Sequence, residues 1–167
     1  MNIAFVFGSK NKKSFGGAER RLSRIYNEIC AEKDDLKCDI VIRRCDINTA
    51  SALFRKADCD VANINHIYAF RSSLRCLLYI LFSRKYKIVH YYYAGKYNMV
   101  EQMACKLSNK KSIYTVCGYE EAYNCCTPKH MLLTKFQLRL ADHVDLLYPL
   151  GADFISRYVK KGRLTVT

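Results

Sequence analysis

The chain has 167 residues, half of them hydrophobic, with 7 glycines and 2 prolines. This length corresponds to one ordinary domain, and the composition excludes a disordered or low-complexity chain. Lysine and arginine (28) exceed aspartate and glutamate (15) and give a net charge of +13, which attracts phosphorylated ligands or anionic lipid. Because the basic residues are dispersed along the chain, nucleic acid is not an expected partner.

Residues 3–7 form an uninterrupted apolar run, which is typical of a strand buried on both faces of a parallel sheet. Leu22, Ile25 and Ile29 then recur at the spacing of an amphipathic helix. The same alternation continues along the chain. Further strands are expected at 38–44, 60–65, 87–93, 111–118 and 143–149, and further helices at 49–57, 70–84, 98–108 and 128–141.

Strands that alternate with helices predict right-handed βαβ crossovers. The expected fold class is therefore α/β, with a doubly wound, mostly parallel sheet flanked by helices in a single domain that spans residues 1–167. Ligands of such sheets bind at the carboxyl ends of the strands.

The cysteine content and the N-terminus bear on the cellular compartment. Nine cysteines are present, but the opening segment MNIAFVFGSK lacks the basic leader and cleavage site of a signal peptide. Reduced thiols and a cytoplasmic location are expected. The most apolar stretch, residues 76–82, is shorter than the roughly 18 residues of a membrane-spanning helix.

The loop after the first strand carries two adjacent glycines, Gly16 and Gly17, at the start of the first helix. Unpaired N–H groups and the positive end of the helix dipole make such a junction an anion site. The loop matches neither the nucleoside triphosphatase pattern nor the dinucleotide pattern of glycines. The alternative is that both glycines serve only the turn.

Four segments resemble, in their order, the N-terminal domain of family-four glycosyltransferases, the retaining GT-B enzymes that use nucleotide sugars. They are Gly16-Gly17-Ala18-Glu19-Arg20, Lys87-Ile88-Val89-His90, Thr115-Val116-Cys117-Gly118 and Ala141-Asp142-His143-Val144.

The resemblance implies a Rossmann-like N-terminal half of a GT-B fold that binds the acceptor. Gly16 and Gly17 would lie against the diphosphate, whereas most donor-binding groups belong to a C-terminal domain that this sequence does not include. A nucleotide sugar is thus the donor substrate only when that domain is supplied, and no covalently bound cofactor is implied. The chain is expected to be truncated and inactive alone.

The candidate catalytic position is Cys117, where the family often has histidine. A thiol cannot replace imidazole as a donor at neutral pH, and a buried, inert thiol is the alternative. Gly118 and Glu120 follow on the same loop and are candidate acceptor-binding residues. The alternative for Glu120 and Glu121, and the more common case for such a pair, is a solvated loop.

His90, near the end of an apolar strand, is a further candidate for binding acceptor or sugar hydroxyls, with a hydrogen-bonded core histidine as the alternative. No metal site is expected, because the spacing of the cysteines after residue 116 is irregular for zinc. The residues considered as zinc ligands are Cys117, Cys125, Cys126 and His130.

The leading hypothesis is the acceptor-side domain of a glycosyltransferase that adds sugar to a lipid-linked or polysaccharide acceptor of the cell envelope. Its expected partners are that acceptor, a C-terminal domain and an anionic membrane surface. The membrane contact would involve basic residues on and after the helix at 70–84, with a solvated helix face as the alternative. These are Arg71, Arg75, Arg84 and Lys85. The alternative is a non-catalytic α/β module that binds phosphate or a protein partner.

Overall fold

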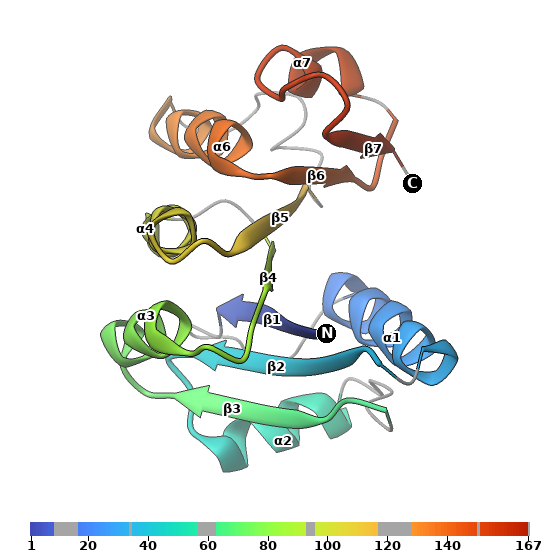
Figure 1. Cartoon of the computed structure of the whole chain (residues 1–167), viewed down its shortest axis with the longest axis vertical. Helices are drawn as coiled ribbons and strands as arrows, with labels where there is room; N and C mark the ends of the chain where they lie inside the picture. Colours follow the sequence, from blue (N-terminus) through green and yellow to red (C-terminus); the bar gives the residue numbers. More distant parts are fainter. Residues whose placement is uncertain are drawn as a thin grey trace. The chain divides into compact units, whose positions relative to one another are not determined.

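The computed structural model describes residues 1–8, 17–33, 35–56, 63–92, 96–116, 128–149 and 151–166. The chain divides into two compact units. The first comprises Met1–Tyr79 with Ser83–Lys87, and the second comprises Ile80–Phe82 with Ile88–Thr167. Figure 1 labels the elements of both units in chain order.

In the first unit, three parallel strands are arranged in the order β3-β2-β1. Strand β1 is buried along most of its length because its apolar run contacts neighbours on both faces of the sheet. The strands are β1 (Asn2–Gly8), β2 (Lys37–Arg43) and β3 (His66–Phe70). The helices are α1 (Gly17–Glu32), α2 (Ile47–Lys56) and α3 (Ser73–Phe82), of which α3 ends in the second unit.

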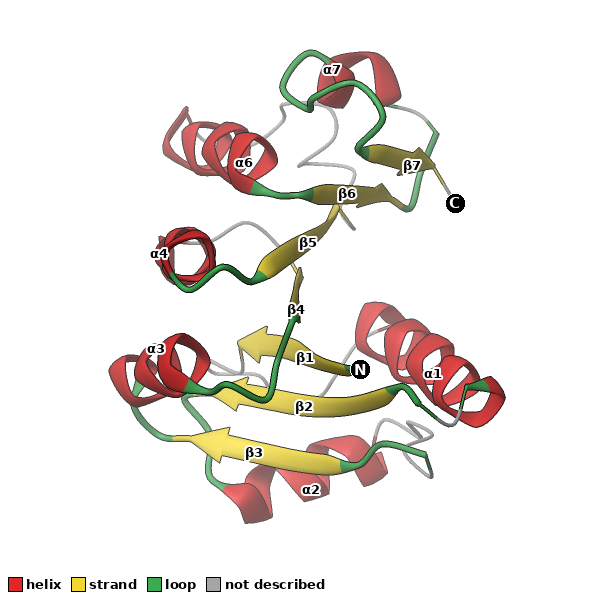
Figure 2. Ribbon diagram, viewed as in Figure 1, coloured by secondary structure: helices red, strands yellow, loops and turns green. Residues whose placement is uncertain are grey.

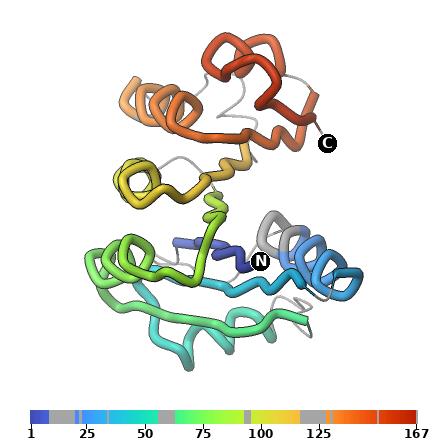
Figure 3. Tube along the Cα trace, in the orientation of Figure 1, coloured from blue at the N-terminus to red at the C-terminus, as the bar shows by residue number. Residues whose placement is uncertain are grey.

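In the second unit, four parallel strands are arranged in the order β4-β5-β6-β7. The trace in Figure 3 passes from strand to helix to strand. The strands are β4 (Ile88–Tyr92), β5 (Lys111–Val116), β6 (His143–Leu146) and β7 (Leu164–Val166). The helices are α4 (Lys96–Leu107), α6 (Pro128–Leu140) and α7 (Ala152–Ser156).

The predicted fold class is confirmed, because helices alternate with parallel strands in an α/β, Rossmann-like arrangement (Figure 2). The strand predicted at 60–65 was placed wrongly. Residues 63–65 are not in a strand, and β3 begins at His66. Asn63 and Asn65 instead hydrogen-bond to the side chains of Asn27 and Asp39, as asparagine favours turns over strands.

One face of the second unit's sheet packs on α4 and α6, which lie side by side. Tyr91 on β4 and Tyr114 on β5 are fully buried, and the Tyr91 hydroxyl lies 3.3 Å from the Cys105 sulfur of α4. At the first turn of α4, the Asn98 amide donates to the carbonyl of Tyr92 at 2.9 Å. These contacts fix α4 against the end of β4.

Lys110 is a buried lysine that holds the last turn of α3 within the second unit. Its ammonium donates to the carbonyls of Ile80 at 2.6 Å and Leu81 at 2.7 Å, and to the Ser108 hydroxyl at 3.3 Å. Carbonyls in the last turn of a helix have no partner within the helix, and a cation is favourable there. Lys110 therefore caps the carboxyl end of α3.

Replacing Lys110 with methionine keeps the aliphatic length but removes these hydrogen bonds. We expect the free energy of unfolding to fall by about 2 kcal/mol, since hydrogen bonds to charged groups contribute about 1.5–3 kcal/mol. Urea unfolding measures the change. Lys111→Met is the matched control, because the Lys111 side chain is 71% exposed and lies 3.9 Å from Asp142, so its loss should cost about 0.5 kcal/mol. Equal losses in both variants would contradict the capping role.

None of the helices in the described ranges combines the length and apolar character needed to cross a membrane.

Candidate functional site

The carboxyl edge of the first unit's sheet carries two adjacent arginines. Gly8 ends β1 and is in register with Arg43, which ends β2. A Cβ atom placed on Gly8 would lie 3.5 Å from the Arg43 guanidinium, so this cation, only 6% exposed, packs against the strand end. Arg44 follows in a left-handed conformation with φ of 57°, and its Nε donates to the Ser73 hydroxyl.

The helix α1 begins at Gly17, after the segment that follows β1. The N–H groups of its first turn have no partner within the helix, and the helix dipole places partial positive charge there. The carboxyl edge of the first unit thus combines buried and partly buried cations with strand ends, which is the electrostatic setting of a site for an anion.

The second unit contains a row of polar side chains that crosses three strands on the sheet face opposite α4 and α6. His90 on β4, Thr115 on β5 and Asp145 on β6 share this face by strand register. The His90 Nε2 lies 2.6 Å from the Thr115 hydroxyl oxygen, and that hydroxyl donates to the Asp145 carboxylate at 3.3 Å. The three side chains therefore form a continuous hydrogen-bond chain.

The hydrogen-bond chain relates the tautomer of His90 to the proton of Thr115. A hydroxyl has one proton; when Thr115 donates it to Asp145, Thr115 accepts from the Nε2–H of His90. Nδ1 is then the acceptor nitrogen of the ring. Burial, together with the charge of nearby His143, lowers the pKa of His90 to about 3, so the imidazole is neutral at physiological pH. A neutral imidazole of this kind suits hydrogen bonding better than proton abstraction.

A cavity of about 380 Å³ lies on the second unit at the opposite, amino-terminal edge of the strands. Its lining includes Ile88, Lys111, His143 and Arg163. Asp142 also lines it. Partial burial alone would raise the pKa of Asp142, but hydrogen bonds from Lys106 and the Ser112 N–H outweigh burial and lower it. Ligands of parallel α/β sheets bind at the carboxyl edge, so this cavity is not the primary candidate.

The predicted site residues fall in different parts of the chain. Gly17 starts α1 in the first unit, and His90 is buried in β4 of the second. Four others, Gly16, Cys117, Gly118 and Glu120, lie outside the described residues, as do Glu121, Cys125 and Cys126. Among the described residues, no three His, Cys, Asp or Glu side chains are grouped to hold a metal ion.

Sequence reasoning missed Arg43, Thr115 and Asp145. Each lies at or near the carboxyl end of a strand, and that position is the signal that would have pointed to them. The sequence could not show that Thr115 and Asp145 are the hydrogen-bond partners of His90. The three residues are separated by 25 and 30 residues in the chain and meet only through strand register.

No protein-family model matches the sequence, and no curated protein matches it significantly. Solved structures do match. The UDP-GlcNAc 2-epimerase from Methanocaldococcus jannaschii covers 99% of the chain with a TM-score of 0.65 at 11% identity. The UDP-GlcNAc 2-epimerase from Neisseria meningitidis, bound to UDP-GlcNAc, covers 100% with a TM-score of 0.67 at 9% identity. Anabaena HepE in complex with UDP-glucose covers 99% with a TM-score of 0.64 at 14% identity.

The chain spans less than half of each of these proteins, namely 45%, 46% and 43% of their lengths. At such low identity the likeness shows the fold alone. The chain therefore has the GT-B-like Rossmann fold of structures that are related to nucleotide sugars.

Proposed function

We propose that this chain is the acceptor-side domain of a family-four-like glycosyltransferase that transfers a sugar from a nucleotide sugar to a lipid-linked or polysaccharide acceptor of the cell envelope. The observation that carries the proposal is the match of nearly the whole chain to less than half of proteins whose structures contain UDP or UDP-sugars. Donor-binding groups would then lie on a further domain.

The placement of the resembling segments supports this proposal. The segment from Lys87 to His90 leads into and lies within β4, Thr115 and Val116 end β5, and the segment from Ala141 to Val144 leads into β6. The described residues of these three segments thus coincide with the start or end of a parallel strand.

In the proposed enzyme, the amino end of α1 with Gly16 and Gly17 binds the diphosphate, since backbone N–H groups can approach it closely there. His90 supplies neutral hydrogen bonds to hydroxyls of the acceptor or sugar. Gly118 and Glu120 bind the acceptor from the segment after β5, and Cys117 occupies the position next to the reacting sugar.

The test compares the chain alone with the chain joined to, or mixed with, a matching donor-binding domain. Alone, it should release no nucleoside diphosphate from any nucleotide sugar, because stabilising the departing diphosphate needs donor-side groups. With the second domain, acceptor-dependent release should appear. A coupled spectroscopic assay for nucleoside diphosphate measures release with and without the second domain. Acceptor-dependent release by the chain alone would refute the proposal that the donor-binding groups lie on a further domain.

The role of α1 is tested by Gly17→Val in the two-domain protein, which should weaken nucleotide binding at least tenfold because the side chain occupies space next to the phosphate. Ala31→Val is the matched control, since it introduces the same side chain at an exposed position near the other end of α1. Isothermal titration measures both affinities. Equal affinity of the Gly17 variant and the unmodified protein would reject the diphosphate role.

A second candidate is a nucleotide-sugar epimerase, favoured because three of the matching structures are described as UDP-GlcNAc 2-epimerases. The same incubation distinguishes the two functions. Transfer requires an acceptor and gives a new glycoside, whereas epimerisation needs no acceptor and changes the configuration at C2, which proton NMR of the sugar detects.

A further inference from the structure

The outward side of α4 and α6 exposes large apolar side chains. Residues on the inward side of α4, such as Glu101 and Cys105, are buried, whereas positions on the opposite side of the helix face solvent. A residue points the same way after three or four positions. The exposed apolar residues on the two helices are Val100, Met103, Leu107, Leu132 and Phe136, and they are 42–86% exposed.

The exposed charges on these two helices are all positive. Glu101 is the one acidic residue in the sequences of α4 and α6, and it is only 1% exposed. Asp142, just after α6, is paired with Lys106 at 2.7 Å. The exposed basic residues are Lys96, Lys106, Lys129 and Arg139. Apolar and basic side chains thus share this surface without an exposed carboxylate from either helix.

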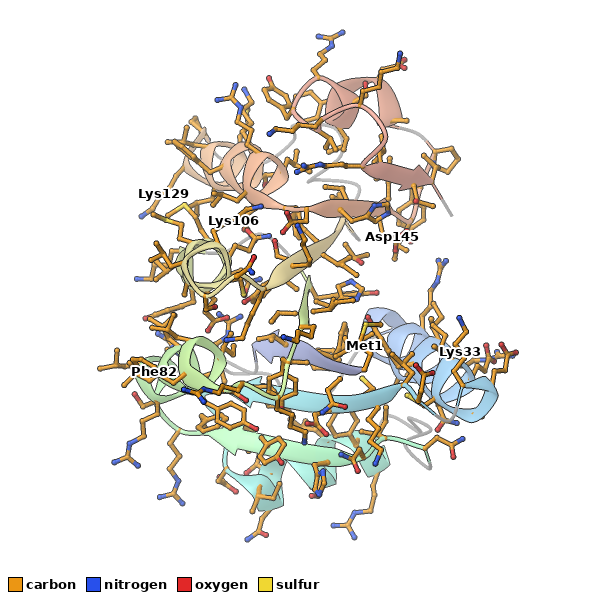
Figure 4. All side chains as sticks on the ribbon, viewed as in Figure 1. Met1, Lys33, Phe82, Lys106, Lys129 and Asp145 are labelled. Carbon is orange, nitrogen blue, oxygen red and sulfur yellow. The ribbon has the colours of Figure 1, made fainter. Side chains whose placement is uncertain are left out.

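The end of α3 adds to the same surface. Ile80–Phe82 belongs to the second unit, where Lys110 holds the carbonyls of Ile80 and Leu81. Phe82 is 73% exposed, and Figure 4 labels it together with Lys106 of α4 and Lys129 of α6. We call the outward residues of α4 and α6, together with Phe82, the apolar-basic face.

Helix α1 of the first unit provides a contrast within the same protein. Its outward side carries charges of both signs, including an Arg24–Glu28 pair at 3.0 Å. None of its described residues is a large exposed hydrophobic side chain. The combination of exposed apolar and basic side chains is therefore absent from the described part of α1, whereas α3 also exposes Leu74 and Leu78.

We propose that the apolar-basic face binds the surface of an anionic lipid bilayer. Exposed apolar clusters on a folded protein mark interaction sites, and helices that lie on membranes combine leucine and phenylalanine with lysine and arginine. Lysine and arginine stems can cover apolar lipid while their charges reach the headgroups. A second copy of the chain would bring positive charge against positive charge, so it is the less suitable occupant.

The experiment is flotation of the chain with vesicles of phosphatidylcholine and phosphatidylglycerol at a 7:3 ratio, compared with vesicles of phosphatidylcholine alone. We expect binding to the anionic vesicles at 50 mM salt and at least tenfold weaker binding at 500 mM salt, because salt screens exposed charges. Absence of binding to anionic vesicles at 50 mM salt would overturn the proposal.

Paired variants locate the surface. Leu107→Ser with Leu132→Ser removes exposed apolar contacts, and Lys96→Gln with Lys129→Gln removes two charges. Each pair should weaken vesicle binding at least tenfold. Arg21→Gln with Lys33→Gln is the control, because it removes two exposed charges on and just after α1 and should weaken binding less than threefold. An equal loss in the control pair would mean that diffuse charge is responsible, and would overturn the proposal.

Two further measurements keep the result interpretable. Circular dichroism confirms that each variant is folded, and Leu107→Gln alone, at an 86% exposed position, replaces the double serine variant if that one unfolds. Light scattering measures the mass of the free chain. A dimer that the leucine variants dissociate, without vesicle binding, would assign the face to contact between copies and contradict the bilayer proposal.

Discussion

Replacing Asp39 with alanine is expected to lower the free energy of unfolding by about 3 kcal/mol. Asp39 on β2 is only 1% exposed. Its carboxylate accepts from the Tyr86 hydroxyl at 2.7 Å and the Asn65 amide at 3.1 Å, and it lies 2.5 Å from the Lys85 ammonium. Removing the Asp39 carboxylate leaves the Lys85 ammonium, the Tyr86 hydroxyl and the Asn65 amide without their shared acceptor.

The charges around Asp39 act as one cluster. Burial alone would lower the pKa of Lys85, but the hydrogen bond and charge of Asp39 outweigh burial and raise it. Burial also raises the pKa of Tyr86, with hydrogen bonds to Tyr79 and Asp39 adding to the effect. The cluster therefore holds a protonated lysine and a neutral tyrosine around one carboxylate.

Urea unfolding of Asp39→Ala, compared with Glu28→Ala, measures the contribution of the cluster. Glu28 forms the exposed pair with Arg24, and its side chain is 59% exposed, so its loss should cost no more than about 0.5 kcal/mol. Tyr86→Phe should fall between the two, at about 1 kcal/mol. If Asp39→Ala costs no more than Glu28→Ala, the cluster does not stabilise the fold.

Acidification is expected to destabilise the protein through His90 by about 3 kcal/mol between pH 6.5 and pH 4. The pKa of His90 is lowered to about 3 in the fold, against about 6.5 in an unfolded chain. Between these values the unfolded chain binds the proton and the folded chain does not, so stability falls as pH falls. The slope is about 1.4 kcal/mol per pH unit within this window.

The measurement is urea unfolding across pH 4–8 for the unmodified chain and for His90→Gln. Glutamine keeps an N–H donor for Thr115 but does not titrate, so the variant should lose much less stability on acidification. Parallel curves for the unmodified chain and His90→Gln would refute this role for burial.

Much of the fold was predictable from local patterns. Apolar runs such as residues 3–7 identified the buried strands, and helical spacing identified α1, α3, α4 and α6. Pro128, expected in a first helical turn, begins α6. The failure at 60–65 has a local cause: asparagine favours turns, and the side-chain amides of Asn63 and Asn65 donate to the Asn27 carbonyl and the Asp39 carboxylate. Strand β7 has three residues, too few for a clear periodic signal.

The candidate site was only partly predictable. The sequence pointed to the glycine-containing segment and to His90, because residue type and position along a strand are local properties. The partners of His90 could not be identified in this way, and neither could the approach of the Arg43 guanidinium to Gly8. Both depend on which residues of neighbouring strands are in register.

The sequence by itself determined the alternation of helices and parallel strands and the strong positive charge, because hydrophobic spacing and residue counts are properties of the chain. The tertiary structure alone decided three things. It brought Thr115 and Asp145 to His90, it gathered Asn65, Lys85 and Tyr86 around Asp39, and it left the apolar side of α4 and α6 facing solvent. The physical reason is that strand register and helix packing join residues far apart in the chain, and burial exists only once those contacts have formed.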